Sequence, residues 1–163
     1  MVNAISALVD NALGDDYWKW RDGAMTDSGV IYCFPWDEGR GILKIDTNTD
    51  VVTELDVNFP ERGIAMWRSC AAGLYGCIYC MPRDGRRIMK IDPNNNDAMT
   101  IVGDDLGSGY YKYKGTVVGI DGCVYGIPLW SRRILKYDPI NDITSFVGEE
   151  ADKAFNCNTN GSL

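Results

Sequence analysis

The chain has 163 residues, of which 45% are hydrophobic and 24% charged, and this composition is typical of one ordinary globular domain. Its formal net charge of −7 argues against a general nucleic-acid binder, because phosphate recognition depends on clustered Lys and Arg that outweigh the acids. The sequence has no run of about 18 apolar residues and no secretory signal at its start, so we expect an intracellular, cytoplasmic protein without membrane insertion.

Residues 1–14 are compatible with two interpretations. As a short amphipathic helix, the segment has Asn3 as its N-cap and apolar residues such as Ile5 and Leu8 on one face. As a strand, it is placed by the match of "ALGDDYWKW" to "DLGSGYYKY" further along the chain, which sets it opposite the last strand of a repeated unit. It would then be a lone strand of a preceding unit, and such a strand needs a partner.

Residues 15–56 form the first of three similar units. Short alternating apolar runs between turn residues predict strands here. The central line of the unit is "GVIYCFPWDEGRGILKID", in which Pro35 ends the second strand because proline cannot donate to a ladder. The loop after Pro35 departs from the repeat and carries Trp36, Asp37, Glu38 and Arg40.

Residues 57–104 form the second unit, which shows four strands most clearly. They are predicted at "RSCAAGL", "CIYCMP", "RIMKID" and "AMTIV". The turns "RDGR" and "PNNND" supply the Gly, Asn and Asp that tolerate the backbone angles of tight turns. The loop after the second strand carries Arg83, Arg86 and Arg87.

Residues 105–150 form the third unit, with the line "GCVYGIPLWSRRILKYD". Its loop after Pro128 carries Trp130, Arg132 and Arg133. Residues 151–163 are polar, so we expect a flexible tail.

The three units recur with a period of about 46 residues, which indicates a repeat architecture. Four antiparallel strands in a unit of this size, without helices, predict a blade of a β-propeller, whose faces are buried only against neighbouring blades. The predicted fold is therefore all-β, a β-propeller with three four-stranded antiparallel blades. The recurrent aromatic residues are interpreted as inter-blade packing: Trp20, Trp67, Tyr113, Tyr32, Tyr79 and Tyr125.

The pattern G-x-[IV]-Y-x-x-P, followed in the later units by R-I-[LM]-K-[IY]-D, resembles the blades of kelch-like and YVTN-like propellers. It is also similar to the blades of streptogramin lyases and gluconolactonase-type lactonases. The resemblance covers residues 17–148 and implies a blade type, whereas such repeats occur in scaffolds and enzymes alike. A streptogramin lyase would imply a catalytic histidine, but this chain has none, which also removes Ser-His-Asp and Cys-His arrangements.

Three blades predict an incomplete ring, because propellers typically have about 4 to 8 blades. Two copies head to tail would close a six-bladed ring as a homodimer. The alternative is that further blades of a longer chain complete the ring.

Two motifs suggest metal chemistry, and the repeat argues against both. Cys77 and Cys80 match C-x-x-C, but strand residues three apart face opposite sides, and we expect reduced thiols. "DTNTD" and "DPNNND" resemble the start of calcium loops, but Asx turns explain them better. We therefore expect no metal and no cofactor, with a divalent cation such as calcium as the less favoured alternative.

The loops after the second strands are the candidate binding surface, because Trp and Arg favour interaction hot spots and guanidinium groups suit carboxylates and phosphates. The competing interpretation is that these arginines pair with acids of their own unit or form a solvated face. The sequence predicts a non-catalytic recognition or scaffold module that binds a protein or another polyvalent partner, with no catalytic residue. The alternative is a lactonase-like or lyase-like enzyme that depends on a metal. The predicted binding residues are Trp36, Asp37, Glu38, Arg40, Arg83, Arg86, Arg87, Trp130, Arg132 and Arg133.

Overall fold

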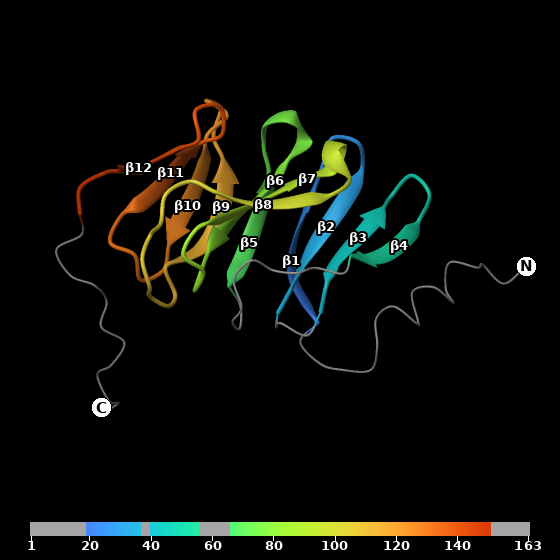
Figure 1. Ribbon diagram of the computed structural model, residues 1–163, viewed down its shortest axis with the longest axis horizontal. Helices are drawn as coiled ribbons and strands as arrows, with labels where there is room; N and C mark the ends of the chain where they lie inside the picture. The colour runs from blue at the N-terminus through green and yellow to red at the C-terminus, as the bar shows by residue number, and fades with distance from the viewer. Residues whose placement is uncertain (1–18, 37–39, 56–65, 151–163) are drawn as a thin grey trace, which may run out of the picture.

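The computed structural model describes residues 19–36, 40–55 and 66–150, and this part of the chain contains twelve β-strands in three sheets (Figure 1). The first sheet contains β1 (Trp20–Met25), β2 (Val30–Pro35), β3 (Ile42–Asp46) and β4 (Val51–Leu55). The second contains β5 (Trp67–Ala72), β6 (Ile78–Pro82), β7 (Ile88–Asp92) and β8 (Ala98–Val102). The third contains β9 (Tyr113–Val118), β10 (Val124–Pro128), β11 (Ile134–Asp138) and β12 (Ile143–Val147).

The predicted all-β fold with three four-stranded antiparallel sheets is confirmed. In each sheet the strands lie in sequence order and pair with their chain neighbours. The described residues form no helix long and apolar enough to cross a membrane, since their helical segments are two 3-10 turns, Leu74–Gly76 and Pro93–Asn95. The predictions for residues 1–14 and for the tail at 151–163 lie outside the described residues.

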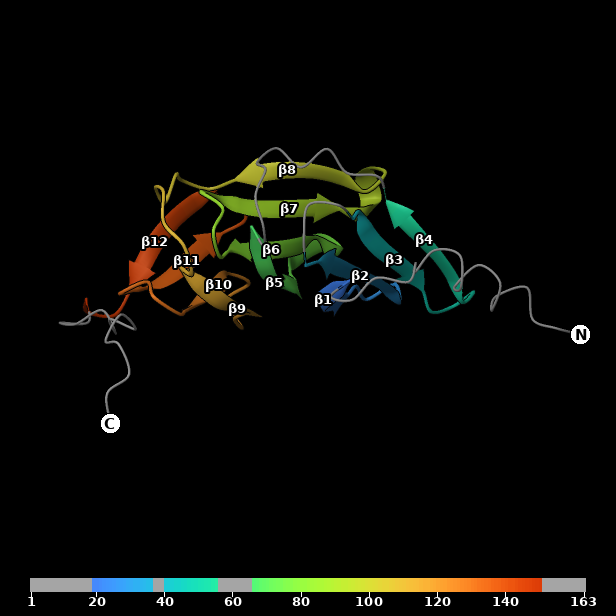
Figure 2. The same ribbon diagram turned by 90° about the horizontal axis from the view of Figure 1, so that it is seen from below.

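The three sheets stand side by side in an arc (Figure 2). The first strand of each sheet (β1, β5 and β9) lies on the concave side, and the last (β4, β8 and β12) lies on the convex side. Side chains join neighbouring inner strands: the Cys70 amide donates to Asp22 at 3.2 Å, and the Thr116 amide donates to Ser69 at 2.9 Å. Within the described residues the arc does not close, which is consistent with the predicted partial ring.

The turn between the third and fourth strands of each sheet is built on an aspartate. A hydrogen bond from the Asn48 backbone holds the pKa of Asp46 below its usual value. An aspartate side chain that accepts a hydrogen bond from the backbone two residues ahead forms an Asx turn, which the sequence predicts at "DTNTD" and "DPNNND". In each turn the carboxylate accepts from the amide two residues ahead, at 2.9 to 3.1 Å: Asn48 to Asp46, Asn94 to Asp92 and Ile140 to Asp138.

Two hydrophobic clusters fill the spaces between neighbouring sheets. Tyr32 and Phe34 of β2 belong with Trp67 of β5 to the cluster between the first and second sheets. Tyr79 of β6 and Tyr113 of β9 belong to the cluster between the second and third sheets. Because a single sheet of this size cannot bury both of its faces, the fold depends on these contacts between sheets.

The aromatic positions of the repeat point in two directions. Trp67 at the start of an inner strand packs toward the preceding sheet, and Tyr79 in a second strand packs toward the following sheet. Trp20 and Tyr125 occupy the same two repeat positions but are only half-buried. The reason is that the described residues contain no sheet before the first and none after the third. The inter-blade packing predicted for these aromatic residues is therefore observed wherever a neighbouring sheet is present.

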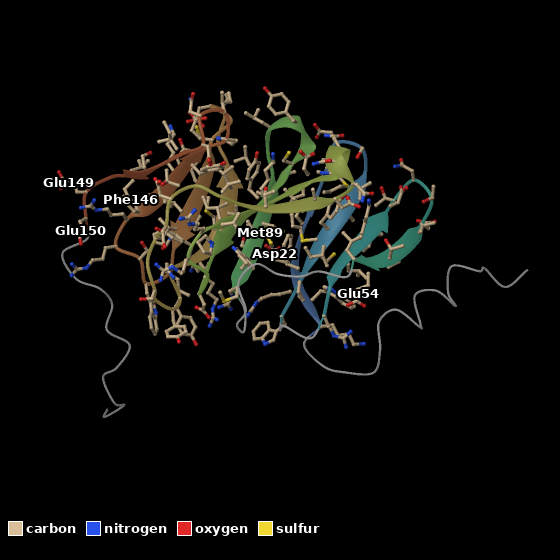
Figure 3. All side chains as sticks on the ribbon, viewed as in Figure 1. Asp22, Glu54, Met89, Phe146, Glu149 and Glu150 are labelled. Carbon is tan, nitrogen blue, oxygen red and sulfur yellow. The ribbon has the colours of Figure 1, made fainter. Side chains whose placement is uncertain are left out.

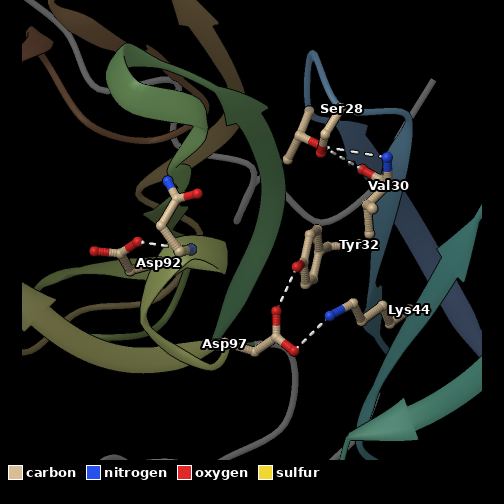
Figure 4. Close-up of polar contacts among 8 residues, drawn as sticks. Ser28, Val30, Tyr32, Lys44, Asp92 and Asp97 are labelled. Atoms are coloured by element: carbon tan, nitrogen blue, oxygen red, sulfur yellow. Dashed lines mark hydrogen bonds and ion pairs between the residues drawn. The ribbon is translucent and has the colours of Figure 1, made fainter.

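A polar contact also joins the first two sheets (Figure 4). Asp97, in the turn before β8, accepts hydrogen bonds from the Tyr32 hydroxyl and, at 2.6 Å, from the Lys44 ammonium. Tyr32 is fully buried, and burial, followed by the Asp97 hydrogen bond, raises its pKa well above the usual value. Lys44 thus pairs with an acid of the next sheet.

The two thiols of the C-x-x-C motif lie on opposite sides of the second sheet. Cys77 belongs to the cluster with the third sheet, and Cys80 belongs to the cluster with the first. Burial raises the pKa of the Cys80 thiol well above its usual value. All five described cysteines are free thiols, whereas Cys157 lies outside the described residues.

Candidate functional site

The loops β2–β3, β6–β7 and β10–β11 lie with the starts of β1, β5 and β9 at one end of the arc, along the lower edge of Figure 1. We call this end the loop face. Each of these loops begins at the same repeat position, directly after the proline that ends the second strand. Its first amide donates to the carbonyl before the inner strand, at 2.8 to 3.0 Å: Trp36 to Lys19, Arg83 to Met66 and Leu129 to Lys112.

Two arginines of the inner strands lie near the ring of Trp36. The guanidinium carbon of Arg21 is 3.5 Å from the centre of the Trp36 ring, and that of Arg68 is 6.0 Å away. Burial is the main cause that lowers the pKa of Arg21, and the charges of Arg68 and Arg83 lower it further. Arg21 thus lies among like charges that disfavour its protonated form.

Arg83, Tyr111 and Trp130 form a stack that connects the second and third sheets. The Arg83 guanidinium carbon is 3.8 Å from the Tyr111 ring centre, and the Tyr111 and Trp130 ring centres are 4.5 Å apart. Asp84 fixes the stack, because it pairs with Arg83 at 2.5 Å and accepts the Tyr111 amide at 2.8 Å. Arg83 is 9% exposed and Trp130 is 45% exposed, so a buried cation supports an accessible ring.

Three predicted arginines nearer the third strands form ion pairs with acids that follow the fourth strand of the same sheet. Arg86 binds Asp105 at 2.6 Å. Arg132 and Arg133 both bind Glu150, at 3.1 and 2.9 Å, and these contacts lower the pKa of Glu150. Glu150 is labelled in Figure 3. Such exposed pairs contribute little to stability, and they reduce the charge that a partner would meet.

The remaining predicted binding residues have different surroundings. The Arg40 guanidinium lies 5.2 Å from the Trp20 ring centre. The Arg87 carbonyl accepts the Trp67 indole N–H at 3.0 Å. Asp37 and Glu38 lie outside the described residues.

Sequence reasoning missed Arg21, Arg68 and Tyr111, which contact the predicted residues directly. The first two follow the aromatic residue that opens each unit, as "WR" in both cases, and they read as ordinary strand residues. A usable signal existed, because the third unit also has a basic residue, Lys114, at this position.

The opposite end of the arc has an open groove of about 540 Å³ between the second and third sheets, lined by the loops β5–β6 and β9–β10. Tyr75 and Ile120 in these loops are strongly exposed. Among the residues that the structure describes, no three His, Cys, Asp or Glu side chains gather closely enough to hold a metal ion.

Three four-stranded meanders that stand side by side in an arc, with their first strands on the concave side, define a β-propeller. The described residues form an open sector of it. No protein-family model matches the chain, and no curated protein matches its sequence.

Solved structures match it as a fold. A catalytically inactive virginiamycin B lyase from Staphylococcus aureus with quinupristin has a TM-score of 0.66 at 14% identity, covering 82% of this chain and 42% of that chain. An auxiliary nutrient binding protein from Bacteroides ovatus has a TM-score of 0.62 at 16% identity, covering 84% and 34%. The hydrazine synthase of Kuenenia stuttgartiensis has a TM-score of 0.61 at 16% identity, covering 81% and 36%. The chain thus spans less than half the length of each of these structures.

Proposed function

We propose that this chain is a non-catalytic recognition module that binds a protein partner through the loop face. The propeller type is further proposed to be kelch-like or YVTN-like, from the repeat pattern alone. The structural neighbours include an enzyme and a binding protein, and at these identities they support a propeller module without separating the two functions.

The observation that carries the proposal is the stack of Arg83, Tyr111 and Trp130. Interface hot spots are enriched in Trp, Tyr and Arg, and a ring held in place before binding loses little conformational entropy on contact. Tyr111 is held in a left-handed backbone conformation, with φ of 58°, by its hydrogen bond to Asp84. Trp130 is therefore a rigid, accessible anchor supported by two sheets.

The proposal is tested by capture with the tagged chain and two variants. Trp130→Ala removes the anchor, whereas Tyr75→Ala removes an aromatic side chain that is 79% exposed at the opposite end of the arc. We expect a protein that is captured by the wild-type chain and by Tyr75→Ala but lost with Trp130→Ala. The purified pair should then show at least about tenfold weaker binding for Trp130→Ala. Equal affinity for all three chains would contradict the proposal.

The alternative function, a metal-dependent propeller enzyme, predicts a different result. A cation that binds the folded chain raises its melting temperature as its concentration rises above the dissociation constant. A saturable rise with calcium, absent with sodium at equal ionic strength, would favour the enzyme. The recognition module predicts no such difference.

A further inference from the structure

Each inner strand contains a β-bulge at the same repeat position, and the extra residue is basic each time. In the first sheet, Trp20 pairs with Pro35 and Asp22 pairs with Phe34, which leaves Arg21 without a partner in the ladder. The same shift leaves out Arg68 in β5 and Lys114 in β9. A bulge re-aims the side chain of its extra residue, and bulges are frequent next to binding sites.

The strands β1, β5 and β9, which carry these three positions, lie along the concave side of the arc (Figure 2). The residues that follow the first two bulges, Asp22 and Ser69, bind the neighbouring inner strand through the hydrogen bonds described above. These bonds fix the lateral spacing of the inner strands directly beside the bulges. The backbone positions of the three basic residues are therefore held side by side.

Acids do not neutralise these charges within the described part of the chain. Arg21 and Arg68 contact the ring of Trp36, and neither they nor Lys114 form an ion pair with a described carboxylate. A guanidinium stacked on a ring keeps the N–H donors of its edge available. In a chain of net charge −7, this is an unusual concentration of unpaired positive charge.

Arg83 adds a second, independent observation. Its side chain is nine-tenths buried, and its Nε–H has no hydrogen-bond acceptor among the described residues. Its backbone bonds to Met66 and Lys112, two residues before Arg68 and Lys114, and this places it beside the second and third bulges. A buried donor without an acceptor is destabilising, so the fold holds the Arg83 charge near the bulges at a cost to its own stability.

We propose that Arg21, Arg68 and Lys114, with Arg83 behind them, form a binding site for a polyvalent oxyanion on the concave side of the propeller. Phosphate and carboxylate groups both match the paired N–H donors of a guanidinium, and a ligand with two or more such groups would bridge adjacent bulges. The inference rests on the proposed recognition function, because the starts of β1, β5 and β9 that carry these residues belong to the loop face, and it names the chemistry recognised there.

The test titrates the purified chain with pyrophosphate and, separately, with citrate, using calorimetry at constant ionic strength set by sodium chloride. We expect saturable binding of at least one of them, and the two arms distinguish a phosphate site from a carboxylate site. Arg21→Gln and Arg68→Gln should each weaken binding about tenfold or more, and Lys114→Gln should weaken it less, since a lysine makes no bidentate contact. The affinity of the wild-type chain should also fall as salt is raised.

Lys136→Gln is the matched control, because it removes one positive charge whose partner, Asp121, lies 2.8 Å away in the β9–β10 loop. The urea midpoint of each variant shows whether it folds, and the salt dependence of the wild-type chain tests the site without any variant. Absence of saturable binding, or an equal loss with Lys136→Gln, would overturn the proposal. No protein partner takes part in these titrations, so their failure is distinguishable from failure of the partner capture.

Discussion

Removing the carboxylate of Asp97 should destabilise the contact between the first two sheets. Asp97 is the acceptor for both the buried Tyr32 hydroxyl and the Lys44 ammonium of the neighbouring sheet. In Asp97→Ala the hydroxyl stays buried and loses its acceptor. The mutation therefore tests whether the sheets are held together by polar contacts as well as by apolar packing.

The expected loss of unfolding free energy follows from the two contacts. A buried hydroxyl left without a partner costs about 1 to 3 kcal/mol. The ion pair adds about 0.2 to 1 kcal/mol, a low value because Lys44 is 29% exposed. The total of about 1 to 4 kcal/mol corresponds to a fall in melting temperature of roughly 2 to 16 °C for a chain of this length. Tyr32→Phe should cost about 1 to 2 kcal/mol, since it removes the hydroxyl without orphaning it.

Urea unfolding at pH 7 and fixed protein concentration, followed by circular dichroism, measures these losses. The double variant should lose less than the sum of the two single variants, because both remove the same hydrogen bond. Additive losses, or an Asp97→Ala variant within about 0.5 kcal/mol of the wild-type chain, would refute the reasoning.

Two further predictions concern pH and assembly. Burial raises the pKa of Tyr32, Tyr79 and Tyr137 above the usual value. Their contribution to the free energy of unfolding is therefore complete below about pH 10 and is lost as the pH rises further. Urea midpoints that stay constant between about pH 9 and 11 would argue against this. We also propose that two chains associate through the outer faces of the first and third sheets, where the paired residues Ile134 and Val147 are 37% and 40% exposed. Sedimentation should then give twice the mass of one chain, and Val147→Asp should shift it toward the monomer, whereas a wild-type monomer at every concentration would disprove the association.

The strand pattern was predictable because the sequence repeats it three times. Alternating apolar residues, the prolines after the second strands and the Asx turns each recur at one interval, so an error in one unit is corrected by the others. The burial of Tyr32 and Tyr79 followed from the same logic. The weaker burial of Trp20 and Tyr125 did not, because it depends on which neighbouring sheets are present.

The contacts of the loop face were only partly predictable. The sequence marked Trp36, Arg83 and Trp130 because they interrupt the repeat, but it gave no sign that Arg83 is buried beneath Tyr111. Arg21 and Arg68 escaped notice for the opposite reason, since they conform to the repeat. A bulge depends on how two strands pair, and one strand read alone does not reveal it.

The opposite directions of the two aromatic positions have a consequence for growth of the fold. Every junction joins an inner-strand ring of one sheet to a second-strand tyrosine of its neighbour, so the two sides of a sheet are unlike. Any additional sheet must therefore attach front to back, and a mirror-like pairing would bring like surfaces together. The three sheets therefore follow one another in a single rotational direction. The angle between neighbouring sheets decides whether further sheets added in this way close into a ring or continue as a spiral.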